Sequence, residues 1–311
     1  MIRVTFLGTS ASRPTVGRNV SAVAVQREGV TLLFDCGEGT QRQMMRYGTG
    51  FAVDHIFISH LHADHYLGVI GLLRTLSLQG RTEALHLYGP AGSRKVLEIA
   101  IELGGNRMSF AVETRELSPG DAVDWDEFTV EAVAVRHGVP AVGYALRERP
   151  RAGRFNVEAA RALGIPEGPL FGRLHRGETI EWGGRRIEPR EVVGGARPGR
   201  LIVFTGDTRP ADAVTECARG ADLLIHDCTF GDEGVDRARE TFHSTAREAA
   251  EIAQRAGVKR LYLTHVSARY SANSDPLLRE AREVFPDAEV AFDGLTVEID
   301  YPEDDERSAS A

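Results

Sequence analysis

The chain has 311 residues, of which 42% are hydrophobic and 26% are charged, as in ordinary globular proteins with ample material for a core. No apolar run approaches the length of a membrane span, and the N-terminal run is too short and too quickly broken for a signal peptide. Three cysteines without paired spacing fit a reducing compartment, so we expect a cytoplasmic protein. The net charge of −8 argues weakly against a nucleic-acid partner.

Short strands and helices are predicted to alternate along most of the chain. Strands are expected at residues 2–7, 22–26, 31–34, 55–59, 85–88, 128–135 and 201–204, and helices from about residue 64, over 93–103 and around 157–163. The capping-box pattern Thr245-Ala246-Arg247-Glu248 predicts a further helix start. The alternation predicts a single α/β domain over residues 1–299, with helices outside the sheets.

One segment, residues 147–199, interrupts this pattern. It is rich in glycine, proline and arginine, which indicates a protruding insertion or a linker. Between residues 147 and 200, twelve arginines accompany seven glutamates without aspartate or lysine, so this stretch carries +5 and the rest of the chain −13. The charges predict a basic appendage on an acidic body. Residues 302–311 are predicted to be a disordered acidic tail.

A dense group of potential metal ligands follows the apolar run at residues 56–58. The segment His60-Leu61-His62-Ala63-Asp64-His65 holds three imidazoles and a carboxylate, and His137, Asp207 and His265 adjoin other strand-like runs. Four such groups within six residues are costly to bury without a metal, because they would repel or remain unpaired. Imidazole and carboxylate suit zinc, although manganese or cobalt could occupy similar ligands.

Seven ligands are more than one ion needs, so the sequence predicts two zinc ions per chain. One carboxylate must bridge the ions for them to sit close together, and Asp207 is our candidate. Such a pair can activate water and stabilise both the attacking and the leaving oxygen of a hydrolysed phosphoester. The predicted chemistry is therefore hydrolysis.

The other histidines have weaker signals. His226 lies at the end of a strand-like run and could support a metal ligand through a hydrogen bond. His243 lies just before the predicted helix start, where it is either a capping or solvated residue or part of the site. His55, His86 and His175 have no chemical neighbours in the sequence and are expected to be structural.

The segment at residues 60–65 resembles the signature of the metallo-β-lactamase superfamily. That resemblance implies an αββα sandwich with a zinc pair at one edge. The superfamily covers many hydrolases, so this signature alone does not choose a substrate.

Other segments resemble ribonuclease Z, the endonuclease family that trims tRNA 3′ ends. They are residues 14–21, 34–43, 163–170, 204–208, 226–230, 242–245 and 263–270, in the family's order. Val16 stands where that family often has lysine, and Asp227 and Cys228 stand where it has glutamate and alanine. The resemblance covers nearly all of residues 1–299 and is to the short form of the enzyme.

The resemblance implies a zinc-dependent endoribonuclease that removes the 3′ trailer of precursor tRNA. The products would be a tRNA with a 3′-hydroxyl and a trailer with a 5′-phosphate. Residues 147–199 would form a flexible arm that holds the tRNA body, and the enzyme would act as a homodimer. One zinc would be held by His60, His62 and His137 and the other by Asp64, His65 and His265, with Asp207 between them. Asp64 would accept a proton and His243 would donate one.

Further residues are candidates for supporting roles. Asp35 is expected to hydrogen-bond a ligand loop, or else to be an ordinary turn carboxylate. RNA contacts near the cut are expected from Arg18, Asn19, Thr40, Gln41, Arg269 and Tyr270, and phosphate contacts in the arm from Arg149, Arg151 and Arg154. The alternatives are structural loop residues and a solvated charge run.

Two other functions remain open from the sequence. The first is another phosphodiesterase or ester hydrolase of the same superfamily, for which the arm would serve no purpose. The second is a metal-dependent RNA-binding or sensor protein without turnover, against which the intact ligand set and His243 argue.

Overall fold

The computed structural model describes residues 1–103 and 107–301, and its main body contains two seven-stranded sheets. The strand order of the first sheet is β16 (Thr296–Ile299), β1 (Ile2–Gly8), β2 (Ala22–Arg27), β3 (Val30–Phe34), β4 (His55–Phe57), β5 (Leu85–Pro90) and β6 (Val112–Leu117). That of the second is β15 (Ala288–Val290), β14 (Leu261–Thr264), β13 (Leu223–Asp227), β12 (Leu201–Phe204), β9 (Val142–Glu148), β8 (Phe128–Ala134) and β7 (Ala122–Asp124). The central strands are continuous apolar runs because both of their faces are buried.

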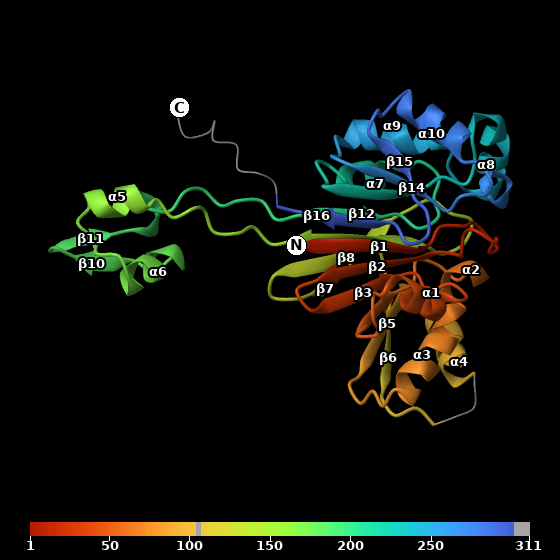
Figure 1. Ribbon diagram of the computed structural model, residues 1–311, viewed down its shortest axis with the longest axis horizontal. Helices are drawn as coiled ribbons and strands as arrows, with labels where there is room; N and C mark the ends of the chain where they lie inside the picture. The colour runs from red at the N-terminus through yellow and green to blue at the C-terminus, as the bar shows by residue number, and fades with distance from the viewer. Residues whose placement is uncertain (104–106, 302–311) are drawn as a thin grey trace. The chain divides into compact units, whose positions relative to one another are not determined.

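Helices cover the outer faces of both sheets (Figure 1). The first sheet packs with α1 (Thr40–Tyr47), α3 (Gly68–Leu78) and α4 (Arg94–Glu102), and the second with α7 (Asp212–Cys217), α9 (Ala246–Ala256) and α10 (Asp275–Arg282). The predicted αββα layering is thus confirmed.

Aromatic side chains join the inner faces of the two sheets. The ring of Phe34 on β3 stacks against Tyr144 on β9 and Phe204 on β12, with 5.8 Å between ring centroids in each pair. The buried Tyr144 hydroxyl donates a 2.7 Å hydrogen bond to the carbonyl of Ile58, just after β4. These contacts hold the loops after β4 and β12 in fixed relation, and both loops contribute to the candidate site.

The sequence predicts helix starts near residue 64 and at the capping box of residues 245–248. The helix expected from about residue 64 is two helices, α2 (Ala63–Tyr66) and α3, which meet at Leu67. Gly68 begins α3 so close to the backbone that an added Cβ would lie 2.0 Å from the carbonyl oxygen of Gly37. The predicted capping box is confirmed, since Thr245 accepts from the N–H of Glu248 and the Glu248 carboxylate accepts from the N–H of Thr245.

A second compact unit consists of residues Asp126–Phe128 and Glu148–Gly199. It contains α5 (Val157–Ala162), α6 (Pro169–His175) and a hairpin of β10 (Ile180–Trp182) and β11 (Arg185–Ile187). Its small core is formed by Ala160, Ile165, Leu174, Ile180, Ile187 and Val192. This part of the chain therefore has its own hydrophobic cluster, which an extended linker would lack.

The acidic tail predicted at residues 302–311 lies outside the described residues. Among the residues that are described, no helix combines the length and the apolar character needed to cross a membrane.

Candidate metal centre

The candidate ligands lie at the carboxyl ends of parallel strands, where α/β proteins commonly build their sites. Asp35 follows β3, and His60 lies three residues after the neighbouring parallel strand β4. Asp207 and His265 follow β12 and β14, and Asp227 ends β13, which pairs in parallel with both. Residues that follow different strands in the sequence thus lie close together in space, at the carboxyl ends of those strands.

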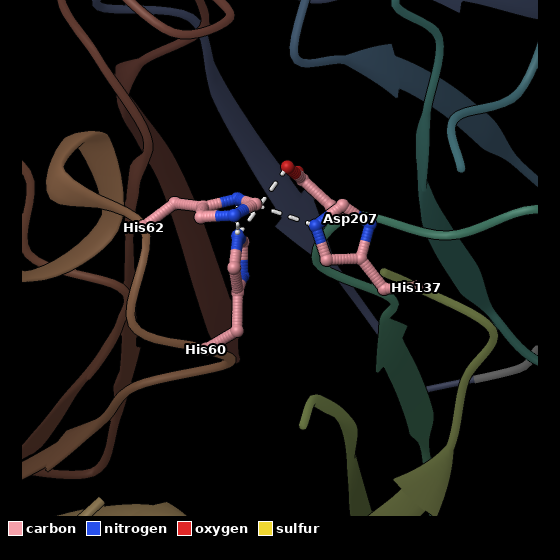
Figure 2. Close-up of side chains that lie close together, drawn as sticks. All are labelled: His60, His62, His137 and Asp207. Atoms are coloured by element: carbon pink, nitrogen blue, oxygen red, sulfur yellow. Dashed lines mark hydrogen bonds and ion pairs between the residues drawn. The ribbon is translucent and has the colours of Figure 1, made fainter. Parts of the chain in front are cut away.

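One group of possible ligands contains His60, His62, His137 and Asp207 (Figure 2). Their potential ligand atoms all lie within 4.8 Å of one another. His62 Nδ1 is 3.0 Å from Nε2 of His60 and 3.3 Å from Nε2 of His137, and Asp207 Oδ2 is 3.5 Å from Nε2 of His60. Burial is the main cause of the lowered pKa values of His60 and His62, and a neutral imidazole is the form that binds a metal.

A second group contains Asp64, His65 and His265, all of them buried. The Oδ2 atom of Asp64 lies 3.3 Å from Nε2 of His265 and 3.4 Å from Nε2 of His65. The backbone N–H of Ser12 donates a 2.7 Å hydrogen bond to the same oxygen and so fixes the carboxylate.

Asp207 lies between the two groups. Its Oδ2 is 3.4 Å from Nε2 of His65, and its Oδ1 is 3.3 Å from Nε2 of His265. Burial would raise the pKa of Asp207, but the surrounding histidines hold it well below its usual range. The buried Asp207 Oδ1 and His65 Nε2 have no hydrogen-bond partner among the described residues. Buried polar atoms are rarely left unpaired, so these donor atoms suit a bound cation, with Asp207 in a position to bridge two.

Groups behind the ligand candidates orient them. Asp35 Oδ2 lies 2.6 Å from Nδ1 of His65, and the other oxygen of Asp35 accepts from the N–H of Ser59. Thr229 Oγ1 lies 2.9 Å from Nδ1 of His265, and the carbonyl of Phe242 accepts from Nδ1 of His137 at 3.1 Å. Engagement of each Nδ1 leaves Nε2 for a metal, which is the usual arrangement at such sites.

His243 contacts a residue that the sequence reasoning did not select. Its Nδ1 lies 2.9 Å from Oδ2 of the fully buried Asp227, whose carboxylate also accepts from the N–H groups of Thr208 and Thr229. His226, expected to support a ligand, instead hydrogen-bonds the carbonyl of Asp227, and its Nε2 is buried without a partner among the described residues. In the structure Asp227, rather than His226, therefore contacts a candidate side chain of the site.

Three of the expected RNA-contacting side chains are buried and committed to internal hydrogen bonds. Arg18 is 8% exposed, and its guanidinium donates to the carbonyl of Ala291 and the hydroxyl of Thr9. Thr40 is fully buried and donates to the carbonyl of Gly37, and Tyr270 donates to Glu233. The expectation that Arg18, Thr40 and Tyr270 contact RNA is not supported, because these groups stabilise the loops themselves.

The remaining candidates are more accessible. Asn19 and Gln41 are half-buried; the Asn19 amide donates to the carbonyl of Glu38, and Gln41 accepts from Thr75. Arg269 is exposed, with its guanidinium 5.1 Å from the ring centroid of Phe230. In the second unit, Arg149 and Arg154 are exposed and Arg151 is half-buried.

The fold, with its adjoining groups of potential metal ligands, points to the hydrolases of the β-lactamase superfamily, and comparisons with known proteins identify the family. The family model described as "Beta-lactamase superfamily domain" matches residues 31–266. The chain is 55% identical over 302 residues to ribonuclease Z of Myxococcus xanthus, covering 96% of this chain and 98% of that protein. It is 52% identical over 307 residues to ribonuclease Z of Haloferax volcanii, covering 98% and 97%.

A solved structure of the same family is also similar to this chain. Human tRNase Z, short form, superposes with a TM-score of 0.70 at 30% identity and covers 96% of this chain and 99% of its own. Within the β-lactamase superfamily, the chain belongs to the ribonuclease Z family.

Proposed function

We propose that this protein is an endoribonuclease that cleaves precursor tRNA at its 3′ end and removes the trailer. The observation that carries the proposal is the sharing of Asp207 by two adjoining ligand groups, in a chain of the ribonuclease Z family. The tRNA would keep a 3′-hydroxyl and the trailer would carry a 5′-phosphate.

The proposed cofactor is a pair of zinc ions. His60, His62 and His137 would hold one, Asp64, His65 and His265 the other, and Asp207 would bridge them. This assignment is supported by the buried His65 Nε2 and Asp207 Oδ1, which have no hydrogen-bond partner among the described residues. When bound, the ions would supply Lewis-acid polarisation of the attacking water and the scissile phosphate. Elemental analysis of purified protein checks both the metal and its stoichiometry.

Asp64 and His243 are the proposed catalytic side chains. Asp64, fixed by Ser12, would accept a hydrogen bond from the attacking water and so orient it. With Nδ1 of His243 engaged by Asp227, its Nε2 remains to give a proton to the leaving 3′-oxygen. Asp35 would keep His65 in the orientation that its ligand role requires.

The proposed tRNA-holding arm is residues 147–199, which make up nearly all of the second compact unit. Its support is the excess of arginine over glutamate and the exposure of Arg149 and Arg154. Asn19, Gln41 and Arg269 are the proposed RNA contacts of the main body. Removal of residues 149–197 should abolish cleavage of precursor tRNA and spare a small chromogenic phosphodiester. Equal loss of both activities would contradict the arm assignment.

Incubation of an end-labelled precursor tRNA with the pure protein tests the function itself. A single chelator-sensitive cut after the last paired or discriminator nucleotide is expected. Binding without any chelator-sensitive product would favour a protein without turnover. Hydrolysis of small phosphodiesters alone would favour another hydrolase of the superfamily.

We also infer that the protein acts as a cytoplasmic homodimer. The dimer follows from the resemblance to the short form of ribonuclease Z, and the compartment from the free thiols of Cys36, Cys217 and Cys228. Light scattering coupled to gel filtration measures the first, and fractionation of cells the second.

A further inference from the structure

Phe242 has a backbone conformation that is unusual for a large side chain. It ends α8 (Val235–Thr241) with φ 60° and ψ 42°, in the left-handed region, and its N–H caps the carbonyl of Ala238. Glycine is the usual residue at such a helix end, because a Cβ is disfavoured there. Burial does not explain the phenylalanine either, since the residue remains 37% exposed. Strained residues of this kind occur often at functional sites.

The position of Phe242 connects it with the candidate metal centre on two sides. Its carbonyl accepts the hydrogen bond from Nδ1 of His137, and His243 is the next residue along the chain. A glycine at position 242 could supply the same carbonyl, so the contact with His137 does not account for the aromatic ring.

The ring itself lies across the residue that follows His137. A Cβ added to Gly138 would be 3.3 Å from Cδ2 and 3.8 Å from Cε2 of Phe242, so the ring packs against the backbone of Gly138. In the group of Figure 2, His60 and Asp207 are buried, whereas His137 is half-buried and His62 is exposed. Phe242 therefore borders His137, one of the two more accessible members of the group, and its ring lies against the exposed Gly138.

We propose that the Phe242 ring is a stacking platform for the nucleobase next to the cleaved phosphodiester. The inference rests on the function proposed above and names a residue that positions the substrate for it. Single-stranded RNA ends are commonly held by bases stacked on aromatic side chains, and every base offers a flat face to such a ring. Phenylalanine has no polar atom with which to read a base, so the platform tolerates any base while fixing the nucleotide at the cut.

The first test compares Phe242→Gly with Phe242→Tyr. Glycine accepts the left-handed backbone and keeps the carbonyl that faces His137, so the variant is expected to fold and retain its metal, which circular dichroism and elemental analysis check. Its kcat/KM for precursor tRNA should fall about tenfold more than its kcat/KM for a small chromogenic phosphodiester, as expected for loss of one stacked base. Tyrosine restores the flat ring and should remain within about twofold of the natural protein. Equal losses on both substrates in Phe242→Gly, or failure of the tyrosine to rescue, would overturn the proposal.

A second test locates the base. Precursor tRNAs with an abasic nucleotide on the 5′ or the 3′ side of the cut are cleaved by the natural protein and by Phe242→Gly. At one of the two positions, removing the base should slow the natural protein about tenfold and leave Phe242→Gly nearly unaffected. Independent, additive losses at both positions would contradict stacking.

Stacking can also be measured by binding alone, without cleavage. With 2-aminopurine at the position so identified, binding of precursor tRNA to chelator-treated natural protein should quench its fluorescence, and binding to Phe242→Gly should not. Equal quenching by both proteins argues against the platform. If the natural, metal-loaded protein fails to cut precursor tRNA at all, the proposed function fails; if it cuts and Phe242→Gly cuts equally well, only the stacking inference fails.

Discussion

The Nδ1 atom of His243 lies 2.9 Å from Oδ2 of Asp227, and this pair adjoins the candidate metal ligands. Burial alone would lower the pKa of His243, but the carboxylates of Asp227 and Asp207 outweigh it and raise that pKa to about 9. The two carboxylates therefore favour the protonated imidazole, which is the form that a proton donor needs.

Replacement of Asp227 by asparagine tests the role of His243 as the proton donor. The substitution removes the negative charge beside His243, so the pKa of His243 falls. Because the donor works only when protonated, the decline of kcat at high pH should begin at a lower pH, and kcat at pH 8 should drop by about 10²-fold. Rate–pH profiles on precursor tRNA measure both effects, with metal content as a control. An unshifted basic limb would show that His243 is not the acid.

Asp207→Asn should weaken metal binding at both groups, since one carboxylate adjoins both. In the natural protein, metal at about 100 times its Kd should stabilise the fold by ~2.7 kcal/mol, seen as a rise in melting temperature. Asp207→Asn should lose most of that rise, and Asp275→Asn, the same change at the exposed start of α10, should keep it. A full rise in Asp207→Asn would contradict the bridging position.

Arg18→Ala should reduce the stability of the folded protein. The substitution leaves the buried carbonyl of Ala291 and hydroxyl of Thr9 without their donor, which should reduce the free energy of unfolding by roughly 2–4 kcal/mol. The exposed Arg269→Ala should change stability by less than ~0.5 kcal/mol. Urea unfolding separates the two. A stable Arg18→Ala protein with weakened tRNA binding would restore the role in RNA contact that the sequence suggested.

His55 should make stability depend on pH. Burial, followed by the stacked ring of His86 with centroids 4.8 Å apart, lowers the pKa of His55 from 6.5 to about 4. Between these values the unfolded chain binds a proton that the folded protein does not, so stability is present above pH 6.5 and declines toward pH 4. The full shift is worth ~3 kcal/mol, and we expect about half of it because His55 is only part-buried. His55→Gln should flatten this decline in urea unfolding across that range, and an unchanged slope would contradict the assignment.

The part of the candidate site that is most visible in the sequence is the part that is local in the chain. Residues 60–65 place four candidate ligands in six positions, so the pattern was visible without a fold. His137, Asp207 and His265 adjoin strand-like runs, but their meeting point depends on which strand ends are neighbours. That order, with β12 between β9 and β13, comes from pairing across distant segments and leaves little trace in any one run.

Two side chains whose contacts differ from the expectation, His226 and Arg18, show the complementary limit. In β13, His226 and Asp227 are neighbours, and adjacent strand residues point to opposite faces, so the sequence alone could not say which one meets His243. An RNA contact is expected of Arg18 from the sequence, where it stands in the segment at residues 14–21 that resembles ribonuclease Z. Its acceptor, the carbonyl of Ala291, lies 273 residues further along, and that distance hid its burial.

The ligand candidates come from both sheets of the body: residues 60–65 follow β4 in the first, and His137, Asp207 and His265 follow strands of the second. Two metal ions bound there would connect segments some two hundred positions apart, as a covalent cross-link would. Closing so long a loop restricts the unfolded chain strongly. The metal supply of the cell would then govern the lifetime of each copy against proteases as well as its turnover. Starvation for the ion would deplete the protein itself.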